Sequence, residues 1–118
     1  MKKLLLLAIA VTGITTFASA QVKKGIQTVT IQTPTVQCES CKKRIEDYLK
    51  REDGVSKATV DFKKHVTKVT FFSERTNVEN VKTAIANAGY DADDVKADEA
   101  AYKKLPKCCQ KTADGGGN

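Results

Sequence analysis

The sequence contains no tryptophan, one methionine and two prolines, and it has no apolar run long enough to cross a bilayer. Its longest apolar run, residues 4–11, falls well short of the roughly 20 residues that a membrane-spanning helix needs. Aromatic residues make up 6% of the chain and are not interleaved with the basic ones. The formal charge of +6 is therefore interpreted as favouring solubility or attraction to an acidic partner, and it does not indicate a nucleic-acid-binding surface.

The N-terminus has the composition of a cleaved secretory signal. Residues 1–3 are basic at two positions, an apolar run follows, and residues 18–20 have the small-residue spacing of a cleavage site. We expect residues 1–20 to be a signal peptide cut after Ala20, residues 21–25 to be a disordered leader, and the mature protein to be periplasmic. Lipoprotein processing is not expected because no cysteine follows the small residues. The alternative is an uncleaved membrane anchor.

The order of hydrophobic patterns predicts a β-α-β-β-α-β chain. Strands are predicted where apolar and polar residues alternate, and helices where apolar residues recur every three or four positions. The expected strands are 26–33, 55–62, 66–72 and 92–97, and the expected helices are 40–51, 76–88 and 98–105. This order is typical of the ferredoxin-like α+β sandwich, in which two helices cover one face of an antiparallel four-stranded sheet.

Several local signals support these boundaries. Thr76 and Glu79 have the spacing of a capping box, and Gly89 lies where a left-handed helix C-cap is needed. The strand at 92–97 has the weakest pattern, because Val95 is its only large apolar residue. The domain is expected to span residues 26–97. A C-terminal helix with a Cys-Cys tail (98–111) and a disordered glycine-rich end (112–118) are expected to follow it.

The four cysteines form two close pairs, Cys38 with Cys41 and Cys108 with Cys109. Cys38 and Cys41 lie where a strand pattern gives way to a helical pattern, so their sulfurs should be close together and half exposed. The amide groups of the first helical turn, with Lys42 nearby, favour the thiolate form. Such a pair suits a soft metal ion or a redox couple. A disulfide framework is less expected, since bridges within either pair close very short loops.

The predicted topology brings other side chains toward the same end. Neighbouring strands run antiparallel, so the Cys38 loop, the turn at residues 63–65 and the turn at Tyr90 should share one end of the sheet. Tyr90 and Lys64 are therefore expected near the sulfurs, and His65 is a candidate auxiliary ligand. The last strand ends at the opposite end. A helix of eight residues rises about 12 Å, however, and a few extended residues add about 10 Å, so the C-terminal tail can return to the thiols.

The region around the first cysteine pair resembles the heavy-metal-associated domain family. Residues 35–41 (TVQCESC) follow the family pattern, with Val36 in place of the usual methionine. Residues 54–62 and 88–91 match further typical stretches, and the resemblance covers about residues 28–97. This family includes copper chaperones, N-terminal modules of metal-pumping ATPases and periplasmic mercury-binding proteins.

The resemblance implies that Cys38 and Cys41 are the metal ligands and that Tyr90 shields the site. The implied cargo is Cu(I) or Hg(II). Zn(II) or Cd(II) is favoured if Cys108 and Cys109 join as auxiliary ligands, because these ions prefer four donors. The implied function is that of a carrier or scavenger, not an enzyme. It would pass the ion by thiolate exchange to a membrane metal transporter or another metal-binding domain. The protein is expected to be a monomer and to have no nucleic-acid partner.

Other interpretations remain open from the sequence. The CxxC pair is also used by thiol-disulfide oxidoreductases, although the absence of tryptophan and of a proline between the cysteines argues against that class. Cys38 and Cys41 could rest as a disulfide in an oxidising compartment, and Cys108 and Cys109 could form disulfides instead of binding metal. The weakest alternative is an interaction domain with incidental thiols.

Overall fold

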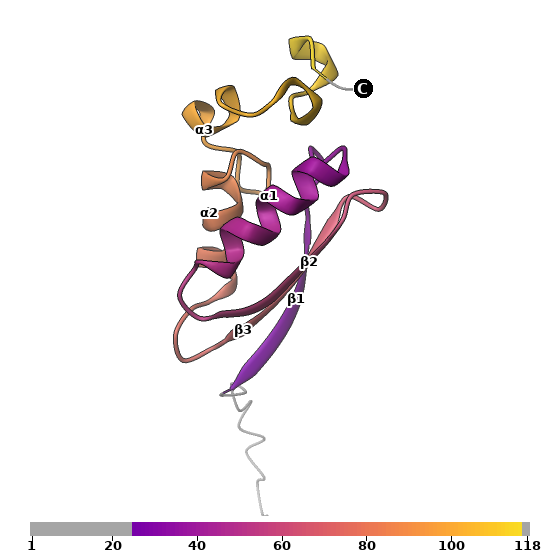
Figure 1. The fold of residues 1–118 in the computed structure, drawn as a ribbon. Helices are drawn as coiled ribbons and strands as arrows, with labels where there is room; N and C mark the ends of the chain where they lie inside the picture. Colours follow the sequence, from indigo (N-terminus) through magenta and orange to yellow (C-terminus); the bar gives the residue numbers. More distant parts are fainter. Residues whose placement is uncertain (1–24, 117–118) are drawn as a thin grey trace, which may run out of the picture.

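The computed structural model describes residues 25–116, which form a three-stranded antiparallel sheet with helices on one face and a C-terminal segment at one end (Figure 1). The sheet contains β1 (Ile26–Gln32), β2 (Val55–Asp61) and β3 (Val66–Phe72) in the order β1-β3-β2. The expected signal peptide, its cleavage site and residues 21–24 of the expected leader lie outside the described residues. The α+β class and the antiparallel sheet agree with the sequence patterns.

The central strand β3 sets the register of the sheet. Val69 pairs with Val29 of β1 on one side and with Ala58 of β2 on the other. Because side chains alternate along a strand, this register places the apolar residues of all three strands on one face. Val69 and Phe71 are almost fully buried on that face. The expected hairpin between β2 and β3 is confirmed.

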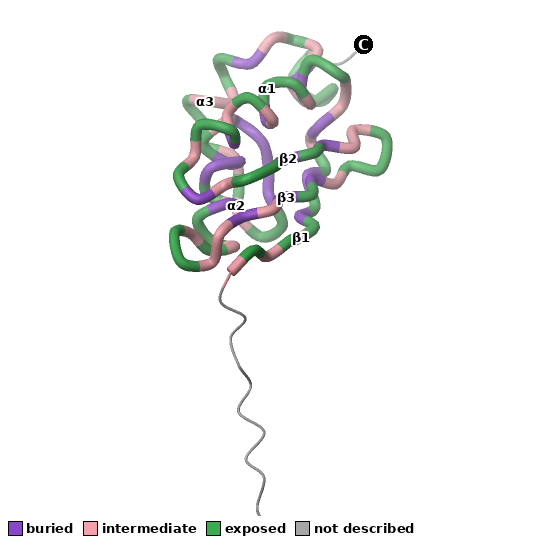
Figure 2. The backbone as a smooth tube through the Cα atoms, turned by 60° about the horizontal axis from the view of Figure 1, so that its bottom comes forward, coloured by how far each residue is buried: buried purple, intermediate pink, exposed green. Residues whose placement is uncertain are grey.

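Two helices, α1 (Glu39–Lys50) and α2 (Val78–Asn87), cover this apolar face. They bury the stripes that the 3.6-residue period predicts. In α1 the buried residues are Cys41, Ile45 and Leu49, and in α2 they are Val81, Ala84, Ile85 and Ala86. Figure 2 shows the buried segments gathered between helices and sheet, where they form one core.

Helix α2 is capped differently from the expected capping box. Asn77, not Thr76, is the N-cap residue, and its side-chain oxygen accepts a hydrogen bond from the Asn80 amide at 2.8 Å. Asparagine is among the best N-cap residues, and its position one residue later shifts the helix start accordingly. At the other end, Gly89 has a φ of +104°, which confirms the need for glycine there.

The predicted fourth strand at residues 92–97 is wrong, since the sheet has three strands within the described residues. Ala92 and Val95 exchange both backbone hydrogen bonds with each other, at 2.9 Å each, and so form a tight turn. Asp93 between them has a φ of +50°, which is incompatible with an extended strand. Their backbone groups are therefore satisfied locally instead of by the sheet edge.

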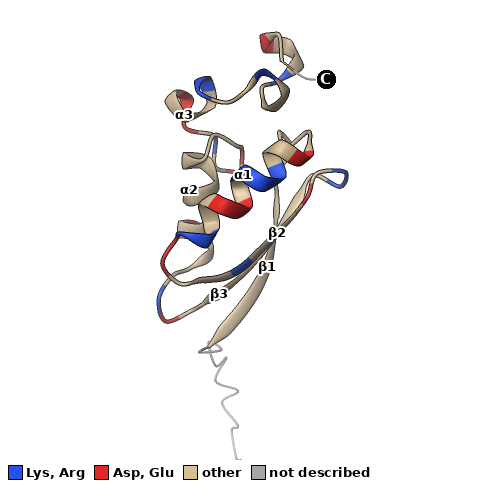
Figure 3. Cartoon of the chain, viewed as in Figure 1, with Lys and Arg blue, Asp and Glu red and all other residues tan. Residues whose placement is uncertain are grey.

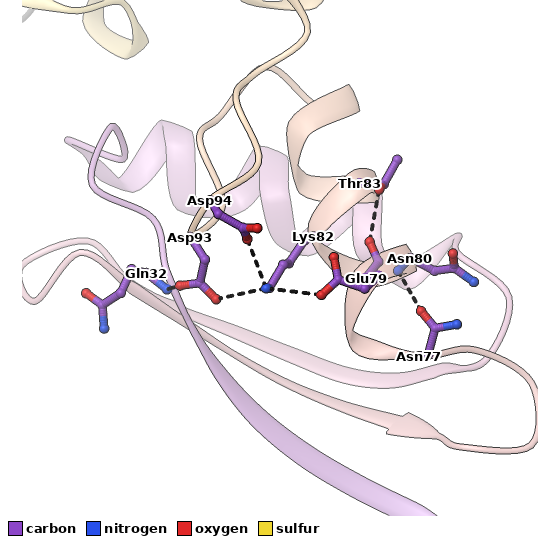
Figure 4. Close-up of polar contacts among 8 residues, drawn as sticks. All are labelled: Gln32, Asn77, Glu79, Asn80, Lys82, Thr83, Asp93 and Asp94. Carbon is purple, nitrogen blue, oxygen red and sulfur yellow. Dashed lines mark hydrogen bonds and ion pairs between the residues drawn. The ribbon is translucent and has the colours of Figure 1, made fainter.

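This turn is held against the end of β1 and against α2. Asp93 accepts a 2.6 Å hydrogen bond from the Gln32 amide, and the Asp93 amide donates to the Gln32 carbonyl at 2.8 Å. Lys82 of α2 lies among three carboxylates, those of Asp93 at 3.7 Å, Asp94 at 3.1 Å and Glu79 at 3.3 Å (Figure 4). A loop fixed by these contacts therefore occupies the place that was expected for the fourth strand.

The C-terminal segment consists of α3 (Glu99–Lys103), η1 (Lys107–Cys109) and η2 (Thr112–Asp114). Asp98 caps α3, since its carboxylate accepts from the Ala101 amide at 2.9 Å. Residues 112–114 form a 3-10 turn, which differs from the disordered end expected there. Within residues 25–116, no helix has both the length and the apolar character that crossing a membrane requires. The segment lies beyond the end of the helical layer where α1 begins (Figure 1).

Candidate metal-binding site

The first thiol pair lies at the N-terminus of α1. Cys38 is the N-cap residue, with extended backbone and no side-chain capping hydrogen bond, and its carbonyl accepts from the Lys42 amide at 3.1 Å. Cys41 follows in the first turn, so one turn of helix brings its Sγ within 3.3 Å of Cys38 Sγ. Cys38 is half-buried and Cys41 is fully buried. The cysteines are free thiols, and Cys38 is the member of the pair that solvent reaches.

The C-terminal tail brings the second thiol pair to the same place. Cys109 Sγ lies 4.0 Å from Cys38 Sγ and 3.9 Å from Cys108 Sγ. The sulfurs of Cys38, Cys108 and Cys109 all lie within 4.8 Å of one another. The tail therefore returns to the CxxC loop across about 70 residues of sequence, as its length allows, and the four thiols form a single cluster.

Specific contacts hold the tail in this position. Leu105 is 6% exposed and packs against Gly89, where an added Cβ would lie only 3.1 Å from the leucine side chain. Gln37, the residue before Cys38, donates a 2.8 Å hydrogen bond to the carbonyl of Gln110, the residue after Cys109. The ammonium group of Lys111 approaches the Asp91 carboxylate at 3.8 Å. These contacts connect residues on both sides of η1 to the domain.

The two ends of the cluster differ in electrostatic environment. Burial raises the pKa of the Cys38 thiol, but hydrogen bonds from the Cys41 amide and from the neighbouring thiols outweigh it, so the net pKa is lowered. Burial raises the pKa of Cys109, and the nearby Cys41 thiol raises it further. Cys38 is thus a readier nucleophile than Cys109, because the thiolate is the reactive form.

Tyr90 lies beneath the cluster, as the predicted topology requires. Its side chain is fully buried, and its hydroxyl finds no partner with hydrogen-bond geometry among residues 25–116. Burial raises the pKa of the phenol, and the thiols of Cys109 and Cys41 raise it further, which places the hydroxyl next to these two sulfurs. Buried hydroxyls are normally satisfied, so an unsatisfied one beside a thiol cluster is unusual.

The hairpin turn supports the CxxC loop from the other side. His65 has a φ of +57°, and its Nδ1 lies 2.8 Å from the carbonyl oxygen of Val36. His65 does not belong to the cluster of potential metal ligands formed by Cys38, Cys108 and Cys109. Val36, which replaces the expected methionine, is fully buried and fills the core below the loop.

Basic side chains occur on two elements near the cluster. Lys42 and Lys43 lie in the first half of α1, where Lys42 approaches Glu46 at 3.8 Å, and Lys64 is exposed in the turn between β2 and β3. Figure 3 shows basic residues on both elements. Lys43 and Arg44 are also exposed. Both elements therefore present positive charge to solvent.

Two supporting residues escaped the sequence-based prediction. Gln37 connects the loop to the tail through its side-chain amide. Thr35 accepts a hydrogen bond from the Asp91 amide at 3.2 Å and so ties the loop to the segment after α2. Neither residue is a predicted ligand, and both partners are more than 50 positions away in the sequence. Only the fold reveals them.

Comparisons with known proteins place the chain among metal-handling domains. The family model described as "Heavy-metal-associated domain" matches residues 30–91. A mercuric transport protein periplasmic component from Shewanella putrefaciens is 44% identical over 64 residues, which cover 54% of this chain and 70% of that protein. A copper-exporting P-type ATPase from Staphylococcus aureus is 35% identical over 68 residues, 58% of this chain and 8% of the ATPase.

A solved structure supports the fold as well as the sequence match. The crystal structure of oxidized MerP from Ralstonia metallidurans CH34 superposes with a TM-score of 0.54 at 34% sequence identity. The match covers 57% of this chain and 93% of that chain. The ferredoxin-like arrangement is therefore supported, although this chain has three strands instead of four in its described part.

Proposed function

Because the chain belongs to the heavy-metal-associated domain family, we propose that it is a periplasmic carrier of a soft metal ion bound through Cys38 and Cys41. The observation that carries this proposal is the pair of free thiols 3.3 Å apart at the start of α1, one of them accessible. Thiolates are soft donors and prefer Cu(I) and Hg(II) to hard ions such as Mg²⁺ and Ca²⁺. The proposed cargo is therefore Cu(I) or Hg(II).

Transfer is proposed to occur by thiolate exchange at Cys38. An incoming thiolate of the acceptor bonds to the ion, one protein sulfur bond to the ion breaks, and the released thiolate takes up a proton. The oxidation state of the ion does not change. Cys38 suits this step because it is half-buried, has a lowered pKa and lies at the rim of the domain. Two sulfur ligands leave the ion open to attack by a third.

The proposed location and partners follow from the relatives and from the surface. The Shewanella relative is named a periplasmic component, and residues 1–20 of this chain have the pattern of a signal peptide. The Staphylococcus relative carries a matching segment within a copper-exporting ATPase. The proposed acceptor is a membrane metal transporter or another domain of this family, with an acidic surface that complements Lys43 and Arg44.

A metal titration tests the binding proposal. The reduced protein is titrated with Cu(I), Hg(II) and Zn(II) in the presence of competing chelators, alongside Cys38→Ser, Cys41→Ser and the control Ser40→Ala. One tightly bound soft ion is expected for the wild type and for Ser40→Ala, which alters an exposed residue between the thiols. Cys38→Ser should lose tight binding. Equal affinity of Cys38→Ser and wild type would refute the site.

The oxidoreductase alternative is not favoured by the family match. An insulin-reduction assay distinguishes it directly. The carrier proposal predicts no turnover above that of a small dithiol, and robust turnover independent of bound metal would support the alternative.

A further inference from the structure

The sulfurs of Cys38, Cys108 and Cys109 already have the spacing of a three-coordinate metal site. With a metal–sulfur bond of about 2.3 Å, three sulfurs in a plane around one ion are about 4.0 Å apart. In the structure, Cys109 Sγ lies 4.0 Å from Cys38 Sγ and 3.9 Å from Cys108 Sγ. The third edge is no longer than 4.8 Å. The triangle thus accepts an ion with little movement of any side chain.

The Cys38–Cys41 pair does not have the spacing of its own two-coordinate site. A linear arrangement with the same bond length requires sulfurs about 4.6 Å apart. The observed separation is 3.3 Å. The pair must therefore open by roughly 1.3 Å to hold an ion alone. Cys41 is also fully buried and does not belong to the group of three mutually close sulfurs.

We propose that the C-terminal tail supplies two further thiolates and that the bound ion rests in a three-sulfur site formed by Cys38, Cys108 and Cys109. This inference rests on the proposed function, since it concerns the same cargo. Cys38 is common to the CxxC pair and to the three-sulfur site. The ion can pass between Cys41 and the tail thiols without leaving Cys38, and it enters and leaves at Cys38, the accessible thiol of the pair.

The exchange within the cluster balances without a redox partner. The thiols of Cys108 and Cys109 each lose a proton to water as their sulfurs bond to the ion. The bond between the ion and Cys41 breaks, and the Cys41 thiolate takes up one proton. Two sulfur bonds form, one breaks, and one net proton is released to solvent. The ion keeps its oxidation state throughout.

The tail contacts are positioned to serve this site. Leu105 packs on Gly89 before the cysteines, and Gln110 bonds to Gln37 after them, so η1 is held at both ends. The Gln37 contact joins the two residues that directly adjoin Cys38 and Cys109 in sequence. The buried Tyr90 hydroxyl, without a partner among the described residues, lies beside the Cys109 sulfur, where it can donate to a thiolate. Donation to a metal-bound thiolate would give this hydroxyl the hydrogen-bond partner that it lacks among the described residues.

The proposed site makes this protein a retaining carrier. A third sulfur blocks the open side through which an acceptor thiolate attacks a two-coordinate ion. Release then requires the tail to undock, so the acceptor must compete with an intramolecular ligand at high effective concentration. We expect slower release than from a carrier that has the CxxC pair alone.

X-ray absorption of the protein loaded with one equivalent of Hg(II) measures the number of sulfur ligands. Three sulfurs are expected for the wild type and for Lys107→Ser, a control at the exposed tail residue beside Cys108. Cys108→Ser and Cys109→Ser should each have two. Their affinity should fall, and transfer to a competing dithiol should accelerate, by at least about tenfold. Cys108 is half-buried, so its variant keeps the test valid if replacing the buried Cys109 disturbs folding.

Alkylation provides an independent readout that needs no spectroscopy of the metal. Mass spectrometry follows iodoacetamide labelling of Cys108 in the reduced protein, with and without one equivalent of Hg(II). The inference predicts that Cys108 is labelled in the metal-free protein and protected in the loaded protein. A site formed by Cys38 and Cys41 alone leaves Cys108 reactive in both states.

The outcomes separate this inference from the proposed function. Two sulfur ligands in the wild type, unchanged affinity in Cys108→Ser and a reactive Cys108 would overturn the three-sulfur site and leave the carrier proposal intact. Failure of the wild type to bind any soft ion would overturn both. Three sulfurs in the wild type and two in the tail variants support both.

Discussion

Replacing Tyr90 by phenylalanine should stabilise the metal-free protein. The Tyr90 side chain is fully buried, and its hydroxyl has no hydrogen-bond partner among residues 25–116. Burying a polar group without a hydrogen-bond partner lowers the free energy of unfolding by about 1–3 kcal/mol, because the group loses its hydrogen bonds to water and forms none in the protein. Tyr90→Phe removes only the hydroxyl and keeps the ring packing. The free energy of unfolding should therefore rise by about 1–2 kcal/mol.

Urea denaturation of the reduced, metal-free protein measures this change. For a domain of this size, about 1 kcal/mol corresponds to about 4–8 °C in Tm, so a thermal scan provides a second measurement. The matched control is Tyr102→Phe, the same chemical change at a satisfied hydroxyl. Tyr102 donates to the Asp114 carboxylate at 2.5 Å and accepts from the Lys111 amide at 2.7 Å. This control should destabilise the tail.

The same Tyr90 variant should weaken metal binding. If the hydroxyl donates to a metal-bound thiolate, its loss removes a hydrogen bond to a charged group and lowers the affinity for the soft ion by roughly tenfold. The two effects thus have opposite signs. If the metal-free Tyr90→Phe variant is less stable than the metal-free wild type, the reasoning is refuted. That result would show that the hydroxyl has a hydrogen-bond partner in the folded protein.

Three further predictions concern the tail and the thiols. Gly89→Ala should lower the free energy of unfolding in urea by at least about 1 kcal/mol, since a side chain at φ +104° is strained and meets Leu105 at 3.1 Å. Leu105→Ala should lower the free energy of unfolding by about 2–3 kcal/mol and speed alkylation of Cys109, because the tail loses its packing against Gly89. An unchanged alkylation rate would show that other contacts hold the tail. The pKa of Cys109 is raised above its ordinary value of 9.0, so the unfolded thiol ionises first. Stability should hold below about pH 9 and fall above it, with a smaller fall in Cys109→Ala, as urea midpoints across pH would show.

The order of elements follows from local patterns in the sequence. The alternation of β1, β2 and β3 and the apolar stripes of α1 and α2 are strong because each element buries one face against a common core. The need for glycine at position 89 follows from the left-handed backbone conformation that a helix C-cap requires there. These features depend on neighbours a few residues away, which is why a single sequence reveals them.

The errors occur where distant contacts compete with local propensity. Residues 92–97 have few apolar side chains, and the turn at Asp93 is pinned by Lys82 and by the end of β1, so it does not extend into a strand. The N-cap residue of α2 is Asn77 instead of the predicted Thr76. Both neighbouring residues suit this position, and the composition does not distinguish between them. The first outcome depends on contacts between distant residues, and the second on a choice between two neighbouring residues that the local pattern leaves open.

The sequence alone determined that two thiols lie one helical turn apart at the start of a helix, because the CxxC spacing and the change of hydrophobic period are local properties. It also determined that the tail is long enough to return to them. Only the tertiary structure decided that the tail does return and that Cys109 stops 4.0 Å from Cys38. That distance depends on Leu105 filling the space left by Gly89 and on the bond from Gln37 to the backbone of residue 110. Contacts between residues so far apart in the chain exist only once the whole core has formed.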